Sequence, residues 1–372
     1  MQSKENHANI APMLEKIRNQ IEKNLHLFLN QRLKFYQLDK IHPNFHKHLV
    51  EFSLRKGKRV RPLLLVLAYS GYQKTAKPIS QSIYRAAASI ELLHNFMLVH
   101  DDIIDCSVLR RSKPTLHKLL EHATPCAQPK KLGVDLGIIA GDLLSTLSVE
   151  ALLSVDEKPE RKQTALAYFT QTTIYTAIGE LIDTVYGFEP LKKISEEKVY
   201  LNYTLKTSRY TFEGPLIIGA ALAGAPNSEI KKLSELSILA GQAFQIQDDV
   251  IGIFGTEKSI GKSILSDLEE SKKTLLVCHA FHNLKGKNKK QFIAIFTKKH
   301  KTLDDLSEIK KLLLKFGSLQ YCLTETSKRL TKALKLLNNS KLKPAVCKEI
   351  SQVINSPFKP SVELAKERGL NF

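Results

Sequence analysis

Apolar and polar residues alternate along most of this chain at spacings of three and four, as they do in amphipathic helices. The pattern begins at residues 11–35, and from residue 304 onward Leu and Ile still alternate with Lys, Glu and Ser. Prolines interrupt it at residues 121–131 and 156–161, which we expect to be loops. The pattern predicts helices throughout and therefore an all-α fold.

Some of the predicted helices are apolar enough to be core elements. Residues 137–153 form such a stretch, and we expect its single acid, Asp142, to be a buried, hydrogen-bonded structural residue. Residues 216–222 form another, and Gly214 and Pro215 predict a break or kink just before it.

Composition supports one large domain. Hydrophobic residues make up 43% of the 372 positions, enough for a substantial core, and no Gly/Ser linker divides the chain. We predict a single-domain helical bundle around a large central cavity, spanning residues 11–355. Residues 1–10 are expected to be a flexible N-terminus, and residues 356–372 a C-terminal extension without assigned chemistry.

The formal charge of +19 invites a nucleic-acid interpretation. However, lysine runs such as residues 285–290 and 298–301 are interspersed with apolar residues, as on solvated helix faces. No basic groove with interleaved aromatic residues and no zinc-finger spacing is present. We therefore expect no nucleic-acid partner; an anionic substrate or an anionic membrane surface explains the charge equally well.

The five cysteines show no Cys-x-x-Cys pair and are odd in number, which favours reduced thiols. The N-terminus lacks an apolar signal core, and the apolar runs read as shorter than the roughly 18 residues that span a bilayer. The expected location is the cytoplasm.

A cluster of acids marks the first candidate site. If residues 90–104 are helical, Asp101 and Asp105 lie one turn apart on one face, with Asp102 beside them and His94 two turns back. Carboxylates this close repel one another, and oxygen ligands suit Mg²⁺, which commonly bridges protein carboxylates to substrate phosphates. Taken alone, the cluster could equally be a solvated acidic helix end.

A second patch favours the metal interpretation. Asp248 and Asp249 again end an apolar run that begins before Gln245. Facing helices that project acids into a bundle core are a known way to build a metal site. If the first helix continued past Asp105, the pair Arg110 and Arg111 would follow about two turns on and could bind a phosphate.

These residues resemble the trans-isoprenyl diphosphate synthases, also called polyprenyl synthetases. Asp101-Asp-Ile-Ile-Asp105 with Arg110-Arg111 is similar to the family's first aspartate motif, and Gln245–Asp249 to its second. The resemblance is colinear over roughly residues 50–350, which makes it more specific than any one motif. It also covers these segments: Gly57–Pro62, Lys206-Thr207, Gly261-Lys262 and Ser266–Leu276.

The resemblance implies a Mg²⁺-dependent condensation of isopentenyl diphosphate with dimethylallyl, geranyl or farnesyl diphosphate. It implies about three Mg²⁺ per site, with Mn²⁺ as an alternative, held by aspartates. The implied metal ligands are Asp101, Asp102, Asp105, Asp248 and Asp249. The implied catalytic residues are Asp101, Asp105, Arg110, Lys206, Thr207, Gln245 and Asp248.

The implied contacts to isopentenyl diphosphate are Lys58, Arg61, His94 and Arg111. On the allylic side, Arg110, Lys206, Lys262 and Lys272 would bind the diphosphate, and Thr207 and Gln245 would stabilise the developing cation. Without the resemblance, Lys58 and Arg61 could be a basic rim, and Lys206 would be read as a surface lysine.

The resemblance also addresses product length. Phe96, five positions before Asp101 and followed by Met97, corresponds to the residue that closes the floor of the tail cavity. This favours a short-chain all-trans product, geranylgeranyl diphosphate first and farnesyl diphosphate second. The resemblance further implies a homodimer with peripheral membrane contact for product release.

Two departures and three alternatives remain. Gly252 stands where many members have a third aspartate, and Ser112 where glycine usually follows the arginine pair. The alternatives are a longer-chain polyprenyl synthase, a class I terpene cyclase and a non-catalytic subunit of a heteromeric synthase. Residues 255–263 resemble a nucleotide-binding P-loop, but have five residues between the glycines where that motif has four.

Overall fold

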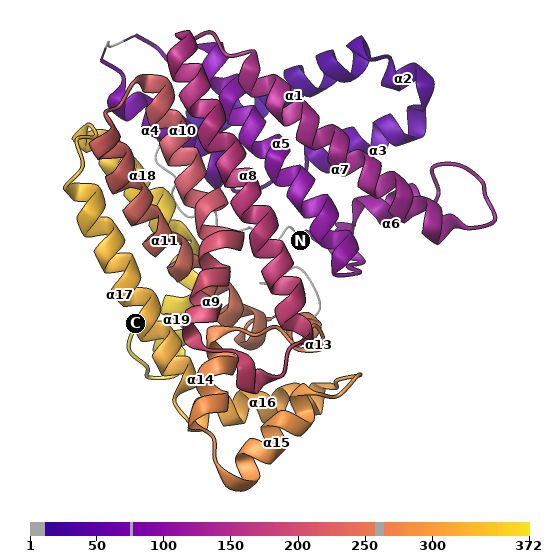
Figure 1. Ribbon diagram of the computed structural model, residues 1–372, viewed down its shortest axis with the longest axis vertical. Coiled ribbons are helices and arrows are strands. Elements are labelled where there is room, and N and C mark those ends of the chain that lie inside the picture. The colour runs from indigo at the N-terminus through magenta and orange to yellow at the C-terminus, as the bar shows by residue number, and fades with distance from the viewer. Residues whose placement is uncertain (1–11, 75–76, 257–263) are drawn as a thin grey trace, which may run out of the picture. The chain divides into compact units, whose positions relative to one another are not determined.

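The chain is almost entirely helical in the computed structural model, which describes residues 12–74, 77–256 and 264–372 (Figure 1). The first half contains α1 Pro12–Phe35, α2 Leu38–Ile41, α3 Pro43–Ser53, α4 Val60–Tyr72, α5 Gln81–Ile104, α6 Leu116–Leu120, α7 Pro129–Leu153 and α8 Pro159–Phe188. The second half contains η1 Leu191–Lys193, α9 Glu196–Asn202, η2 Tyr203–Glu213, α10 Gly214–Ala223, α11 Asn227–Phe254, α13 Ser266–Glu269, α14 Leu275–Asn283, α15 Gly286–Phe296, α16 Leu303–Lys315, α17 Ser318–Asn338, α18 Pro344–Asn355, η3 Ser356–Phe358 and α19 Lys359–Glu367. The predicted all-α fold is confirmed.

The chain divides into two compact units, which are described separately. Unit 1 comprises residues 1–167, 215–226 and 342–356, and unit 2 comprises residues 168–214, 227–341 and 357–372. The predicted domain boundaries and the central cavity remain predictions, and residues 1–10 lie outside the described part of the chain.

Helix α5 is the central element of unit 1. It packs against α1, α4 and α7 (Figure 1), and most of its residues from Ser82 to Leu93 are buried. Small alanines at positions 86–88 allow neighbouring helices to approach closely. Because α5 is held on several sides, its C-terminal end, which carries the first aspartate motif, has a fixed position within the unit.

Helix α7 differs from its expectation in two ways. An 18-residue window within it reaches a mean hydropathy of 1.6, so one helix of the described residues is long and apolar enough to cross a membrane. The expectation that no run approaches this length was therefore wrong. Helix α7 was also expected to be buried as a whole. Only 44% of that window is buried, and Ile138 and Ile139 are exposed. The helix packs against α5 and α6, as a core helix of unit 1 does.

The expected structural role of Asp142 was also wrong. This side chain is 70% exposed, and it lies near His100, with 3.8 Å between Oδ1 and the ring Nε2. Which residues of a helix are buried depends on how the helix is rotated about its axis. A helix with apolar residues on all sides gives no sequence pattern from which that rotation can be predicted.

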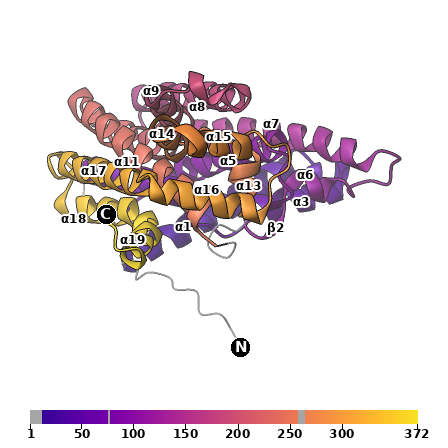
Figure 2. The ribbon, with the colours of Figure 1, turned by 90° about the horizontal axis from the view of Figure 1, so that it is seen from below.

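Helix α11 is the central element of unit 2. It packs against α17, beside which it runs in Figure 2, and against η2. The extension at the C-terminus is helical: α19 packs on α11, and the Gln247 side-chain amide donates to the carbonyl of Pro357. The segment that resembled a P-loop begins where α11 ends, and residues 257–263 lie outside the described part.

The break predicted at Gly214-Pro215 takes the form of a π-helix. The chain passes without a loop from α9 through the π-helical η2 into α10, and the amide of Gly214 donates to the carbonyl of Arg209, five residues back. The wider π turn supplies the change of register that the proline requires. This irregular segment carries Lys206 and Thr207.

Candidate active site

The first aspartate motif lies at the C-terminal end of α5, as expected. Asp101 and Asp102 belong to the last helical turn, and Asp105 caps the helix, with its amide bonded to the carbonyl of Asp101 at 2.9 Å. Asp101 and Asp105 are half-buried, whereas Asp102 is fully buried. The three acids are therefore not equivalent, although the sequence presents them as one cluster.

Arg110 neutralises two of these acids. Its Nε donates to Asp102 at 2.7 Å and its Nη2 to Asp101 at 3.0 Å. The helix does not continue to the arginine pair, because α5 ends at Ile104 and Arg110 lies in a β-hairpin of β1 Leu109–Arg110 and β2 Lys113–Pro114. The hairpin folds back and brings Arg110 to the acids it follows in sequence.

Burial raises the pKa of the Asp102 carboxyl to about 6, although Arg110 acts in the opposite direction. Its second oxygen, Oδ2, is buried and has no hydrogen-bond partner among the described residues. A buried carboxylate oxygen without a partner is costly unless a proton or a cation is close by.

A basic cluster forms at the start of α4 and the adjacent face of α5. Arg61 lies with its Nη1 3.3 Å from Nε2 of His94, and Lys58 is exposed in the preceding loop. The segment passes here from a loop into a helix: α4 begins at Val60, so Arg61 lies in its first turn. Burial and the charge of Arg61 lower the pKa of His94 well below its usual value, which leaves its imidazole neutral.

Arg111 fixes the loop that carries Lys58. Its Nη1 donates to the carbonyls of Arg55 at 3.0 Å and Lys56 at 3.2 Å. Arg111 and Ser112 both have positive φ, 54° and 58°, as the two central residues of a tight hairpin turn require. The serine at position 112 therefore adopts the backbone that a glycine would.

Arg59 is a buried residue that the sequence pattern did not single out. Its guanidinium donates to Glu22 at 2.7 Å and to Glu91, and its backbone is left-handed with a φ of 51°. Unlike the exposed Lys58 before it, Arg59 turns inward and pairs with acids. No local signal distinguishes it, because its partners come from α1 and α5.

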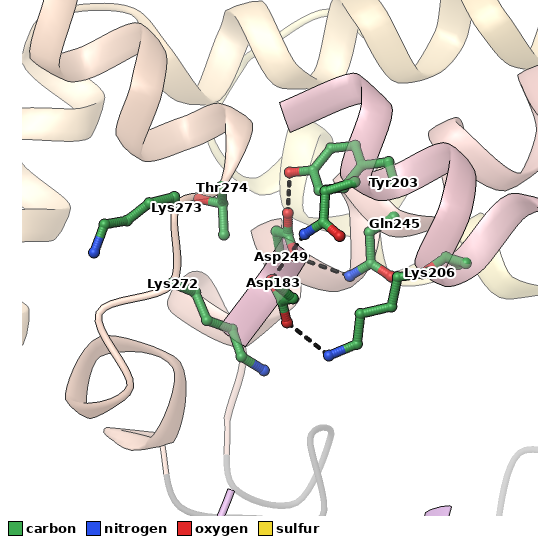
Figure 3. A pocket seen from close by; sticks show the side chains of 10 residues that line it. Asp183, Tyr203, Lys206, Gln245, Asp249, Lys272, Lys273 and Thr274 are labelled. Carbon is green, nitrogen blue, oxygen red and sulfur yellow. Dashed lines mark hydrogen bonds and ion pairs between the residues drawn. The ribbon is translucent and has the colours of Figure 1, made fainter. Parts of the chain in front are cut away.

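The second aspartate motif lies within α11, which continues past the aspartates to Phe254. Asp248 is exposed and Asp249 is buried. The hydroxyl of Tyr203 and the amide of Gln245 donate to Asp249, the latter at 3.0 Å (Figure 3). Burial raises the pKa of Asp249 to about 8, against the effect of these donors.

These side chains line a polar cavity of about 60 Å³ in unit 2 (Figure 3). The Thr207 hydroxyl donates to Oε1 of Gln245 at 2.6 Å, so the two residues expected to stabilise a cation are in contact. The lining residues are Asp183, Asn202, Tyr203, Lys206, Thr207, Gln245, Asp249, Lys272, Lys273 and Thr274.

Lys206 is held by two acids, in contrast to the surface position that its spacing alone suggested. Its ammonium lies 2.6 Å from Asp183 (Figure 3) and 3.0 Å from Glu180, and both acids are on α8. A Cβ at Gly179 would overlap the backbone of Lys206, so this glycine permits the close approach of η2 to α8. Glu180 and Asp183 are site residues to which the sequence assigned no role; their three-residue spacing on one helix face was the available signal.

Lys272 reaches the same cavity from the segment after α13. Its Nζ lies 2.9 Å from Glu270 and 3.6 Å from Asp267. Lys262, the other lysine expected here, lies outside the described residues.

The surroundings of Gly252 explain why this chain has a glycine where many family members have a third aspartate. A Cβ there would overlap Oδ2 of Asp267, which is buried. The position in α11 that holds an acid in many family members is therefore filled in this chain by a carboxylate from α13.

No three His, Cys, Asp or Glu side chains of the described residues are arranged to hold a metal ion by themselves. Carboxylate oxygens nevertheless suit Mg²⁺, which is commonly bound by one or two carboxylates, waters and substrate phosphates. Unit 1 offers them at Asp101 and Asp105, and unit 2 offers them at the exposed Asp248. The buried Oδ2 of Asp102 adds local negative charge beside two of these donors. Each of these acidic patches, taken within its own unit, thus fits a divalent ion that binds together with a diphosphate.

Phe96 and Met97 lie on α5, both half-buried. The Phe96 ring packs against the core cluster of unit 1 and meets the His100 ring edge-on, with 4.8 Å between centroids.

The five cysteines are free thiols.

Known proteins are similar to this chain in sequence and in fold. The polyprenyl synthetase family model matches residues 42–313. A short chain isoprenyl diphosphate synthase of Methanocaldococcus jannaschii is 32% identical over 294 residues, 78% of this chain and 82% of that protein. A geranylgeranyl diphosphate synthase of Sulfolobus acidocaldarius is 33% identical over 289 residues, 76% of this chain and 80% of that protein.

The fold is shared with a crystal structure of geranylgeranyl pyrophosphate synthase from Corynebacterium glutamicum, complexed with isoprenyl diphosphate and magnesium. The TM-score is 0.85 at 26% sequence identity, and the match covers 93% of this chain and 99% of that one.

Proposed function

Since this chain belongs to the polyprenyl synthetase family and is a short-chain trans-prenyltransferase, we propose that it makes geranylgeranyl diphosphate from isopentenyl diphosphate and an allylic diphosphate. Farnesyl diphosphate is the second candidate product. The observation that carries the proposal is that each aspartate motif lies beside cationic side chains: Asp101 pairs with Arg110 in unit 1, and Asp249 lines one cavity with Lys206 and Lys272 in unit 2.

The family acts on isoprenyl diphosphates with a divalent metal, and we propose Mg²⁺, about three per site. Asp101, Asp105 and Asp248 would be the direct ligands, with the buried Asp102 and Asp249 supporting them from behind. When bound, the metal would neutralise charge on the diphosphate leaving group.

The protein's own side chains bind and orient the two substrates. Lys58, Arg61, His94 and Arg111 would hold isopentenyl diphosphate; the neutral imidazole of His94 can donate one hydrogen bond without adding charge. Arg110, Lys206, Lys262 and Lys272 would bind the allylic diphosphate. Both Arg110 and Lys206 are held by acids, so diphosphate binding would exchange these partners.

In the reaction the allylic C–O bond breaks and its electron pair leaves with diphosphate. The double bond of isopentenyl diphosphate then attacks the allylic cation, forming the new C–C bond. The departing diphosphate accepts the proton that is lost, so no side-chain base is needed. The Thr207–Gln245 pair would direct oxygen dipoles at the cation, and preorganised dipoles of this kind lower a barrier without reorganising.

Replacing Asp101 tests the catalytic assignment. Asp101→Ala should lower kcat by roughly two to three orders of magnitude, because a preorganised group aimed at developing charge commonly contributes that much. Circular dichroism and thermal unfolding should show an intact fold. Near-normal Mg²⁺-dependent turnover would remove Asp101 from the mechanism.

We propose that Phe96, together with Met97, limits the length of the product. Its ring packs within unit 1 just before the first aspartate motif, where a growing tail that starts at that motif would meet it. Phe96→Ala should shift the products to longer chains, measured by chromatography after extended incubation. An unchanged distribution would place the cavity floor elsewhere.

We also propose a homodimer in the cytoplasm, with peripheral membrane contact during product release. The exposed Ile138 and Ile139 on α7 are an apolar surface that a second copy could cover. Light scattering after size exclusion, with Ile139→Lys as the variant, would test the dimer.

Incubation of the purified protein with labelled isopentenyl diphosphate, Mg²⁺ and each allylic primer tests the whole proposal. A linear C20 product supports it. A cyclic hydrocarbon, products well beyond C20, or no product without a second subunit would favour a terpene cyclase, a longer-chain synthase or a non-catalytic subunit, respectively.

A further inference from the structure

The segment that presents Lys272 ends in an unusual turn. After α13, the amide of Ser271 donates to the carbonyl of Leu268 at 3.1 Å, and the amide of Lys272 to the carbonyl of Asp267 at 3.3 Å. Ser271 has a φ of 53°. These paired bonds with a left-handed residue between them form a Schellman turn, in which that residue is usually glycine.

A serine at this position costs about 1 kcal/mol in backbone energy relative to glycine, so something outside the turn must stabilise it. The Ser271 hydroxyl provides two contacts. It donates to the carbonyl of Phe296 at 3.2 Å and accepts from Nζ of Lys301 at 3.0 Å. The turn is thereby tied to the segment between α15 and α16.

Lys301 is buried, with 5% of its surface exposed. The expectation that residues 298–301 lie on a solvated face was therefore wrong for this lysine. Its ammonium also donates to the carbonyls of Lys298 at 3.0 Å and Glu269 at 3.5 Å. Three acceptors match the three donors of an ammonium group, and the nearby carboxylates of Glu269 and Asp305 favour its charge, which together explain how this lysine can be buried.

A second lysine holds the turn from the side of α8. Nζ of Lys273 donates to the carbonyls of Ser271 at 3.0 Å and Gly187 at 2.8 Å. Lys272 therefore lies between two residues, Ser271 and Lys273, whose positions these hydrogen bonds fix. Its side chain lines the cavity that also contains Lys206 and Asp249.

We propose that Lys301 is a positioning residue for substrate binding: it fixes the Ser271 turn, and with it the place of the Lys272 ammonium in the cavity. The inference rests on the proposed function, in which Lys272 binds the allylic diphosphate. The hydrogen bonds of the Lys301 ammonium go to Glu269, Ser271 and Lys298, which do not line the cavity, so it would act through the turn.

Lys301→Met keeps the aliphatic stem and removes the ammonium. We expect KM for the allylic diphosphate to rise by on the order of tenfold, because small misplacements of a binding group are costly. KM for isopentenyl diphosphate should change less than about twofold, because its proposed contacts are side chains on other elements than the Ser271 turn. Lys299→Met is the matched control: this lysine is exposed in the same segment and should leave both KM values unchanged.

A double-mutant cycle with Lys272→Met separates the inference from the proposed function. If Lys272→Met alone leaves the allylic KM unchanged, the proposed role of Lys272 is wrong. If it raises that KM, Lys301→Met should add less than about twofold in the double variant. Full additivity, or an equal rise in both KM values for Lys301→Met, would overturn the positioning role and indicate a general loss of structure.

Ser271→Gly provides a rescue. Glycine adopts the left-handed backbone without the serine hydroxyl, so the turn should depend less on Lys301. In this background the rise in allylic KM caused by Lys301→Met should be smaller than in the parent chain by about threefold or more. An undiminished effect would contradict the mechanism through the turn.

Discussion

At the scale of single residues, neighbouring side chains of one type take different roles. Asp101 and Asp248 are accessible, whereas Asp102 and Asp249 are buried, with raised pKa values of about 6 and about 8 that burial causes. Each motif thus combines accessible acids, Asp101 and Asp105 in the first and Asp248 in the second, with one buried acid that hydrogen bonds orient. Burial, which the sequence does not display, makes the distinction.

The same scale explains the missing third acid of the second motif. Gly252→Asp would place a side chain on the Asp267 carboxylate and add charge near Asp249. We expect a loss of about 2 kcal/mol in unfolding free energy, measured by urea denaturation, since overlap and an uncompensated buried charge both destabilise.

Combining Gly252→Asp with Asp267→Ala should recover most of that loss, because the new acid then has the vacated space. Asp267→Ala alone is the control. Additive losses in the double variant would mean that the two positions do not compete for one space.

At the scale of elements, the irregular η2 segment is held by close contact with α8. Gly179→Ala would push a methyl group into the backbone of Lys206. We expect a loss of about 1 to 3 kcal/mol, the range for overpacking, together with a raised allylic KM because the ion pairs of Lys206 with Glu180 and Asp183 are displaced.

Gly187 supplies the control on the same helix, since a Cβ there meets nothing within 4 Å. Gly187→Ala should be neutral or slightly stabilising, as alanine favours helix by up to about 1 kcal/mol over glycine. Equal behaviour of the two variants in thermal unfolding would show that α8 and η2 are not in the tight contact described.

At the scale of the whole molecule, the buried carboxyls make stability depend on pH. Asp249 has a folded pKa of about 8, well above its usual value, so its stabilising effect is complete below about pH 4 and is lost as the pH rises to about 8. With EDTA present to remove divalent ions, the contribution of Asp249 to the unfolding free energy should fall by roughly 1.4 kcal/mol for each pH unit between about pH 4 and about pH 8.

Asp249→Asn removes this titration and keeps the shape. The difference between wild type and variant cancels the other titrating groups, His94 among them. Urea denaturation between about pH 6 and about pH 8 isolates Asp249, because Asp102 has mostly ionised above its pKa of about 6. Parallel pH profiles of the two proteins would contradict the raised pKa.

The sequence by itself determined the helices, the two aspartate motifs and the family. Helical periodicity and motif spacing are local properties, and colinear motifs are specific enough to identify a shared fold. The contacts Arg61–His94 and Thr207–Gln245 join residues that the resemblance grouped together, and the substrate roles of these four residues stay predictions.

Only the tertiary structure decided which side chains are buried and which partners they meet. Arg59, Lys301 and Asp267 looked like ordinary charged residues, yet each is buried against groups from other segments, whereas Asp142, in an apolar stretch, is exposed. Partners distant in sequence leave no local pattern, and burial of a charge depends on whether those partners satisfy it. Within each unit, chain folding therefore set the electrostatic roles that sequence left open.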